Sequence, residues 1–207
     1  MRAKSLPALR REAAGCTRCD LYKYATRTVF GEGVAGASMM LVGEQPGDAE
    51  DVAGKPFVGP AGKLLDKALA DAGIARGDAY VTNAVKHFKF IVRGKKRLHQ
   101  KPNAIQVEAC HPWLEAEVAA VRPTVVVLLG ATAGQSVMGR SFRVTKERGK
   151  LLASDLAPAV VATVHPSSLL RMPDRSRWEA EYARFVADLK IAGKAAAKAG
   201  KRAKAAA

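Results

Sequence analysis

Four short apolar runs rich in β-branched residues alternate with helix-like segments, and this alternation constrains the fold more than any other feature of the chain. The runs are residues 37–42, 79–85, 124–129 and 159–164. Between them, apolar residues recur at helical spacing in 59–72 and 103–120. Strands that alternate with helices form parallel sheets, because each connection must cross over a face of the sheet. The sequence therefore predicts an α/β fold with a four-stranded parallel sheet flanked by helices on both faces.

One domain of residues 1–190 followed by a tail of residues 191–207 accounts for the remaining sequence. A helix is predicted over 5–14, the 103–120 helix is expected to turn Ile105 and Trp113 inward, and an amphipathic helix carrying Phe185 closes the domain. Residues 191–207 are rich in Ala and Lys and lack an evident apolar stripe. We expect either a flexible basic tail that adds affinity for phosphates or an inert, frayed helix end.

The charge of the chain indicates a polyanionic partner. Lys and Arg number 34 against 19 Asp and Glu, which gives a net charge of +15, and such an excess is typical of proteins that bind nucleic acid. No apolar run reaches the roughly 18 residues that span a bilayer, and the basic N-terminus has no apolar signal core. We expect a cytoplasmic monomer without membrane contact.

Three cysteines, an odd number, argue against a disulfide framework and favour metal ligation. Cys16 and Cys19 form a Cys-x-x-Cys pair, whose spacing lets two thiolates reach one metal or cluster, and Cys110 lies on the 103–120 segment. Spacing alone leaves zinc and iron–sulfur chemistry both open.

Two glycine motifs are excluded as nucleotide sites. Gly31-x-Gly33-x-x-Gly36 precedes the first predicted strand and opens no helix, so a dinucleotide phosphate would have no helix N-terminus to bind, which removes a Rossmann-type oxidoreductase. Gly59-x-x-Gly62-Lys63 lacks P-loop spacing and the Ser or Thr that binds magnesium.

Polar segments follow three of the predicted strands. They are 43–48 (GEQPGD), the 83–101 segment and 165–171 (HPSSLLR). The carboxyl ends of parallel strands meet at one edge of a sheet, where ligands bind. We expect these segments to form one cleft.

Four motifs in order, together with the cysteines, resemble the iron–sulfur (family four) uracil-DNA glycosylases up to about residue 189. The motifs are GEQPGD at 43–48, KPFVGPAG at 55–62, Thr82-Asn83, and HPSSLL at 165–170. The resemblance implies excision of uracil from uracil-containing DNA, single-stranded or double-stranded, with free uracil as the product. It also implies a structural 4Fe-4S cluster.

This family typically has four cysteine ligands, and His87 occupies the position of the third. The resemblance therefore implies the ligand set Cys16, Cys19, His87 and Cys110, since imidazole replaces thiolate at some iron–sulfur clusters. A different fourth ligand and a zinc site with three Cys and one His remain alternatives. His111 is expected to pack near the cluster.

The resemblance also assigns a uracil pocket. Phe57 would stack on the pyrimidine, Asn83 would bond the edge that distinguishes uracil from cytosine, and His165 would donate to O2 of the leaving base. Gly43 and Ser167 would complete the substrate site.

A basic insertion at 93–101 (RGKKRLHQK) resembles the loop of UdgX-type glycosylases, which become covalently attached to DNA. The resemblance implies that His99 captures C1′ of the sugar, with Glu44 bonded to its other ring nitrogen, fixing the tautomer and balancing charge. Gln45 and Asp48 would position the sugar or the uracil, and Arg97 would hold the loop against DNA. The remaining DNA contacts are expected from Lys95, Lys96 and Arg171.

Two other functions remain open at this point. An ordinary turnover glycosylase would use a water activated by a carboxylate and would leave His99 as a DNA contact. A non-catalytic iron–sulfur DNA-binding protein would account for the charge but not for Asn83 and His165.

Overall fold

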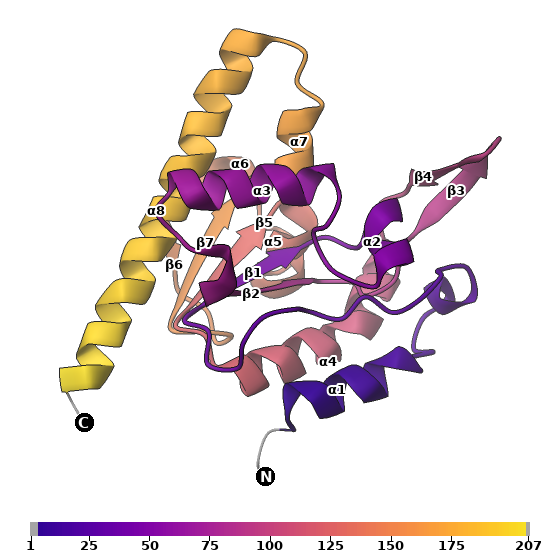
Figure 1. Cartoon of the computed structure of the whole chain (residues 1–207), viewed down its shortest axis with the longest axis horizontal. Coiled ribbons are helices and arrows are strands. Elements are labelled where there is room, and N and C mark those ends of the chain that lie inside the picture. Colours follow the sequence, from indigo (N-terminus) through magenta and orange to yellow (C-terminus); the bar gives the residue numbers. More distant parts are fainter. Residues whose placement is uncertain (1–3, 206–207) are drawn as a thin grey trace.

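A mostly parallel five-stranded sheet in the order β2-β1-β5-β7-β6 forms the centre of the computed structural model, which describes residues 4–205 (Figure 1). Strands β1 (Met39–Gly43), β2 (Ala79–Asn83), β5 (Val125–Leu129) and β7 (Ala159–Thr163) are parallel and correspond to the four predicted runs. The fifth strand, β6 (Leu151–Leu152), pairs antiparallel with β7. The α/β prediction is confirmed, and the predicted number of strands was one too low because two residues carry no periodicity.

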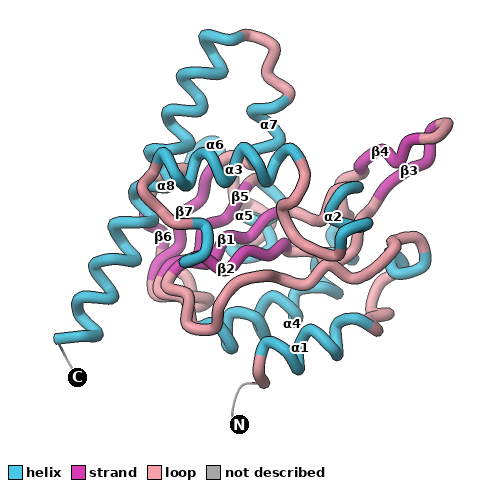
Figure 2. The backbone as a smooth tube through the Cα atoms, viewed as in Figure 1, coloured by secondary structure: helices cyan, strands magenta, loops and turns pink. Residues whose placement is uncertain are grey.

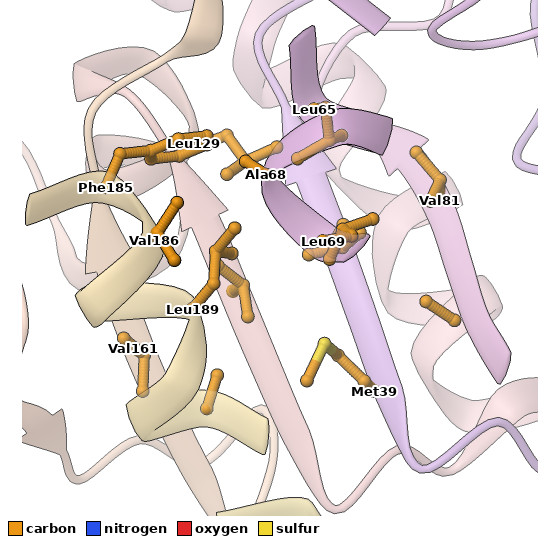
Figure 3. Packing of buried hydrophobic residues seen from close by; sticks show 14 of the residues in the cluster. Met39, Leu65, Ala68, Leu69, Val81, Leu129, Val161, Phe185, Val186 and Leu189 are labelled. Atoms are coloured by element: carbon orange, nitrogen blue, oxygen red, sulfur yellow. The ribbon is translucent and has the colours of Figure 1, made fainter. Parts of the chain in front are cut away.

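Helices cover both faces of the sheet, as expected. Met39 and Leu41 of β1 face a core shared with α3 (Pro60–Asp71) and α8 (Arg175–Ala205), which Figure 3 shows from close by. Met40 and Val42 point the other way, toward α4 (Ala104–Val121) and α5 (Ala131–Met138). Side chains alternate along a strand, so a sheet that is buried on both faces needs apolar residues at every position. This explains why the runs are continuous rather than alternating.

Shorter elements complete the chain. Helix α1 (Leu6–Ala14) packs against α4, and the short helices are α2 (Asp48–Ala53), α6 (Val144–Glu147) and α7 (Pro166–Leu170). Two 3-10 turns, η1 (Asp20–Lys23) and η2 (Arg76–Asp78), lie in the connections. Among the described residues, no helix combines the length and the apolar character needed to cross a lipid bilayer.

The basic insertion is a β-hairpin rather than an irregular loop. Strand β3 (Phe90–Arg93) pairs antiparallel with β4 (Lys96–His99), and the hairpin projects away from the central sheet (Figure 2). Gly94 begins the tight turn with a φ of 59°, a conformation that glycine adopts without steric cost. His99 therefore lies at the end of a strand, in register with Phe90.

Two details of the helices differ from the expectation. The boundary expected between residues 190 and 191 lies inside α8, where Ala192 and Ala196 are buried in the core, and the division into a domain and a tail stays a prediction. Ile105 is 76% exposed, whereas Gln106 is buried and forms a capping box with Asn103 at the start of α4. The N-terminal cap sets the rotation of this helix and turns Ile105 outward.

A fully buried ion pair joins the segment that follows β2 to helix α4. Lys86 Nζ lies 2.5 Å from Glu117 Oε2, and both side chains have no exposed area. Glu117 also accepts hydrogen bonds from the Gly31 amide and the Tyr80 hydroxyl, both at 2.9 Å. This carboxylate therefore ties α4 to β2 and to the segment that precedes β1.

We predict that Lys86→Met lowers the free energy of unfolding by about 3–5 kcal/mol, because it leaves the Glu117 carboxylate buried without its cation. Lys86→Met combined with Glu117→Gln should recover part of that loss. Urea unfolding followed by circular dichroism measures both. The control is Lys4→Met, which breaks an exposed ion pair with Glu12 and should change the midpoint little. Equal midpoints for Lys86→Met and Lys4→Met would contradict the prediction.

Candidate active site at the carboxyl ends of the strands

Polar side chains from four strand ends meet at one edge of the sheet. Glu44 follows β1, Asn83 ends β2, Thr132 lies in the first turn of α5 after β5, and His165 follows β7. All four strands are parallel, so their carboxyl ends point to the same side, where open α/β sheets bind their ligands. The structure thus brings together the segments that the sequence predicted to converge.

Gly43 lies against both Phe57 and Asn83. It pairs with Asn83 in the register of β1 and β2. A Cβ atom on Gly43 would clash with Asn83 Oδ1 and with the ring of Phe57. Glycine at this position therefore lets the aromatic ring and the amide approach each other, which agrees with its predicted place in the substrate site.

Phe57 is held in an uncommon backbone conformation. Its φ is 57°, a left-handed value that a bulky residue rarely adopts and that costs roughly 1–3 kcal/mol. Gly62 in the first turn of α3 makes this possible, since a Cβ there would overlap the carbonyl of Phe57. The Phe57 and His165 rings lie with centroids 6.0 Å apart and planes tilted by 31°. Backbone strain such as that of Phe57 is typical of functional sites.

The neighbours of His165 fix its tautomer. Its Nδ1 accepts the backbone N–H of Ser167 at 3.2 Å and lies 2.8 Å from the Ser167 hydroxyl oxygen, so the neutral ring carries its proton on Nε2. Burial lowers the pKa of His165 to about 4, which the Glu44 carboxylate opposes and His99 and Arg171 reinforce. At neutral pH this residue is an uncharged N–H donor. Ser167, predicted to bind substrate, contacts His165 with its own hydroxyl.

Glu44 connects two side chains across the site. Its Oε1 lies 3.2 Å from His99 Nε2, and its Oε2 accepts a hydrogen bond from Thr132 Oγ1. Burial favours the neutral acid, but the bonds from His99 and Thr132 and the nearby imidazoles of His99 and His165 together lower the pKa of Glu44. It is therefore a carboxylate at neutral pH, and its expected contact with His99 is present.

Gln45 contacts the two ends of the β3-β4 hairpin. Its Nε2 donates to the carbonyls of Lys89 at 3.2 Å and Gln100 at 3.0 Å, and its Oε1 accepts the Lys89 amide at 3.1 Å. The side chain is buried, with both of its N–H donors in use. Gln45 thus holds together the residues at the start and the end of the β3-β4 hairpin, and its expected role in positioning a sugar or a uracil stays a prediction.

Arg97 and Asp48 contact each other in the free protein. Arg97 Nε lies 2.5 Å from Asp48 Oδ1, and its Nη1 lies 2.6 Å from Oδ2 of the fully buried Asp51. The guanidinium covers the rings of Phe88 and Phe90, 5.5 and 5.0 Å from their centroids. These attractions are internal, and the contacts expected between Arg97 and DNA and between Asp48 and the substrate stay predictions. Together the attractions fasten the hairpin to α2.

The other predicted DNA contacts remain available to a ligand. Lys95 and Lys96 lie exposed at the tip of the hairpin, and Arg171 is exposed just after α7. Arg171 is close enough to His165 to help lower its pKa. Exposed cations therefore lie both on the hairpin and after α7.

The three cysteines gather around an apolar cluster that includes Leu9, Leu21 and Trp113. Trp113 Nε1 donates to Cys16 Sγ, and the Lys86 amide donates to Cys110 Sγ, both at 3.2 Å. Burial raises the pKa of Cys110 to about 11 against the lowering influence of Lys86, and Cys19 and Cys16 lie near enough to raise it further. N–H donors to sulfur and apolar surroundings fit thiolate ligands of an iron–sulfur cluster.

His87 lies next to this cluster in sequence but its side chain is turned to another partner. It is buried, and its Nε2 lies 2.8 Å from Thr28 Oγ1. Among residues 4–205, no three His, Cys, Asp or Glu side chains lie close enough together to hold a metal ion as they stand. The predicted ligand set therefore stays a prediction. His111 Nε2 lies 3.6 Å from Glu115 Oε1, and its expected packing near the cluster stays a prediction.

Two residues of the site were absent from the sequence predictions. Thr132 holds Glu44, and Asp51 holds Arg97. A signal for Thr132 exists, because it follows the third apolar run and lies at the same sheet edge as the other strand ends. Asp51 has no comparable signal, since one acid within an acidic helix does not reveal which partner it meets.

Comparisons with known proteins agree with this geometry. A sequence model described as the uracil DNA glycosylase superfamily matches residues 30–190. A Type-4 uracil-DNA glycosylase of Thermotoga maritima is 39% identical over 157 residues, which cover 75% of this chain and 78% of the relative. Type-4 uracil-DNA glycosylases of Pyrobaculum aerophilum and Archaeoglobus fulgidus are 35% and 34% identical, over 82% and 86% of this chain and 87% and 90% of their own lengths.

The environment of His165 predicts a specific pH dependence. Its folded pKa of about 4 lies below the ordinary value near 6.5, so the unfolded chain binds this proton more readily between those values. Acidification through this window should lower the free energy of unfolding. The His165 ring resonances in NMR spectra should stay constant from pH 8 to about pH 5. His165→Asn, the control, assigns the signal and should weaken the pH dependence of the urea midpoint. Titration of His165 near pH 6.5 would contradict the prediction.

Proposed function

The chain belongs to the uracil DNA glycosylase superfamily, and from this premise we propose that it excises uracil from DNA by breaking the N-glycosidic bond. The observation that carries the proposal is the meeting of Phe57, Asn83 and His165 at one edge of the sheet, where a neutral histidine offers an N–H donor; these side chains would form the uracil pocket. A base stacked in DNA cannot reach such a pocket, so the target nucleotide must be flipped out or single-stranded. The net charge of +15 supports DNA as the substrate.

Recognition of uracil would come from stacking and from one amide. The Phe57 ring offers a face for the pyrimidine, and the Asn83 amide would donate to O4 and accept from N3–H. Cytosine has its donor and acceptor exchanged at these positions, so it would leave buried polar groups unpaired. Phe57 and Asn83 converge on Gly43, which supports their action on one base.

Bond cleavage would be driven by charges at both ends of the breaking bond. The electron pair of the C1′–N1 bond passes to uracil, and the Nε2–H of His165 would stabilise the negative charge that develops on O2. The deoxyribose becomes positive at C1′, and the Glu44 carboxylate would stabilise that charge. A neutral donor suits this role, because it binds the anion without first losing solvation of its own charge.

We further propose that His99 captures C1′ and leaves the protein covalently attached to DNA. The lone pair of one imidazole nitrogen forms the new C1′–N bond. Uracil departs as an anion and takes up a proton from solvent. The ring in the adduct would be positively charged, and Glu44, 3.2 Å from His99 in the free protein, would balance this charge or accept the ring proton.

An ordinary turnover glycosylase is the second candidate, because Glu44 would serve equally well to activate a water molecule. The arrangement of the hairpin favours capture by His99. Gln45 donates to the carbonyl of Gln100, next to His99, and Arg97 joins the hairpin to Asp48 and Asp51. These contacts hold His99 beside Glu44. A residue that only touches DNA phosphates would need no such support.

The thiol site supports a 4Fe-4S cluster held by Cys16, Cys19, His87 and Cys110. Three of these ligands lie together with N–H donors on two sulfur atoms, and His87 would have to exchange its bond with Thr28 for the cluster. The cluster would supply structural cross-linking between the N-terminal segment and α4. The name of the relatives, Type-4 uracil-DNA glycosylase, agrees with the resemblance to the family four enzymes. Zinc is the alternative metal.

Denaturing gel electrophoresis with uracil-containing single-stranded DNA tests the covalent step. Wild-type protein should give a shifted band that survives heat and SDS. His99→Ser should release uracil without any band, since the pocket is intact and water replaces the imidazole. Glu44→Gln should slow uracil release by about 10²-fold or more. His111→Ser, the matched control, should give the wild-type band at saturating DNA. Release of uracil by wild type without a stable band would contradict capture by His99 and support an ordinary turnover glycosylase.

Metal analysis tests the cluster independently of activity. The purified protein should contain iron and acid-labile sulfide in equal amounts, and Cys110→Ser should lose both because it removes a buried thiolate. His87→Ala should also lower the iron content, whereas His111→Ala should not. Zinc in place of iron would overturn the cluster, and unchanged iron in His87→Ala would exclude His87 as a ligand.

A further inference from the structure

A groove of about 620 Å³ lies between α4 and α5, outside the proposed pocket. One wall is a single face of α4, formed by residues at helical spacing: Ala104, Val107, Glu108, His111 and Pro112. This volume falls in the range of sites that bind a small ligand or a nucleotide. None of the catalytic steps proposed above uses these side chains.

The groove is continuous with the candidate active site. Its opposite wall includes Thr132, whose hydroxyl donates to Glu44. Lys101 also lines it and follows His99 closely in the chain. A DNA strand that places its sugar beside Glu44 and His99 therefore has an adjoining nucleotide within reach of the groove.

The lining combines apolar surface with cations. Pro102 and Val107 supply apolar walls, and Lys101 and Arg140 supply positive charge. Arg140 pairs with Glu108 at 3.9 Å, but the two side chains are 83% and 79% exposed. A pair this long and this exposed is weak, so a phosphate can replace the carboxylate. Base and phosphate are the two chemical groups that such a lining accommodates together.

We propose that this groove holds the nucleotide next to the target uracil on single-stranded DNA, with its base against Pro102 and Val107 and its phosphate near Lys101 and Arg140. The inference rests on the proposed function for the position of the target. It specifies single-stranded DNA, because a base that enters a groove between two helices has left its partner and its stack. Sequence-tolerant binding is expected, since every base offers an apolar face.

Binding of a labelled, uracil-free single-stranded oligonucleotide tests the groove without any chemistry. Lys101→Glu and Arg140→Glu should each weaken binding about 10-fold. Each should also lower the slope of log K against log salt concentration by about one, which corresponds to one lost phosphate contact. Arg122→Glu makes the same charge change just before β5, at the opposite end of the sheet, and should have a much smaller effect. Equal losses in all three variants would overturn the groove, because they would report net charge alone.

Uracil release tests the base contact. Substrates with a base-free tetrahydrofuran sugar on one side of the uracil should raise the half-saturating DNA concentration of wild type about 10-fold, and on one side only. Val107→Ala shortens this wall without placing a charge against the apolar cluster at the thiol site, and it should reduce that difference while the rate at saturation stays within about 2-fold. A penalty that is equal on both sides, or unchanged in Val107→Ala, would overturn the groove.

The two proposals fail in different ways. Wild type that binds uracil-free DNA with the predicted losses in Lys101→Glu and Arg140→Glu but releases no uracil would overturn the proposed function and support the groove. Uracil release with Arg140→Glu indistinguishable from Arg122→Glu would support the function and overturn the groove.

Discussion

The buried pair of Lys86 and Glu117 is the interaction on which the rest of the structure depends. Lys86 Nζ also donates to the Asn83 carbonyl at 2.7 Å, while its backbone amide donates to Cys110 Sγ. One residue therefore connects the end of β2, where the base would be read, to the thiol site. A charged pair without solvent is tolerated only with complete hydrogen bonding, and Glu117 has four donors within reach. Uracil recognition and the thiol site thus share a single rigid connection.

Two histidines of the site differ in their surroundings, and this difference separates their roles. His165 accepts the Ser167 amide at Nδ1, is kept neutral by burial, and is left with an N–H donor at Nε2. His99 is half exposed at the end of β4 and contacts a carboxylate. A neutral donor suits a leaving anion, whereas an accessible imidazole beside a carboxylate suits attack on a cation. Environment, rather than residue type, supports the assignment.

Much of the fold and the location of the site could be predicted from the sequence, because parallel strands place their carboxyl ends together. This rule predicts that Glu44, Asn83 and His165 lie at one edge. It applies equally to Thr132, which follows the third run. Partners could not be predicted. Gln45, Asp48 and Arg97 lie where the motifs place them, but their contacts are internal, because hydrogen bonding and charge pairing depend on neighbours that are distant in sequence. The same holds for Ile105, whose orientation a cap decided.

Those internal contacts explain how an imidazole could compete with water for the sugar. Water is abundant everywhere in an open site, so a nucleophile on a mobile loop would rarely be first to meet a short-lived cation. A group held in near-attack geometry gains an effective concentration of about 10⁵ M or more. Gln45 and Arg97 reduce the freedom of the β3-β4 hairpin, and Glu44 restricts the ring of His99. The residues first expected to touch the substrate would therefore contribute to the reaction by holding His99 still.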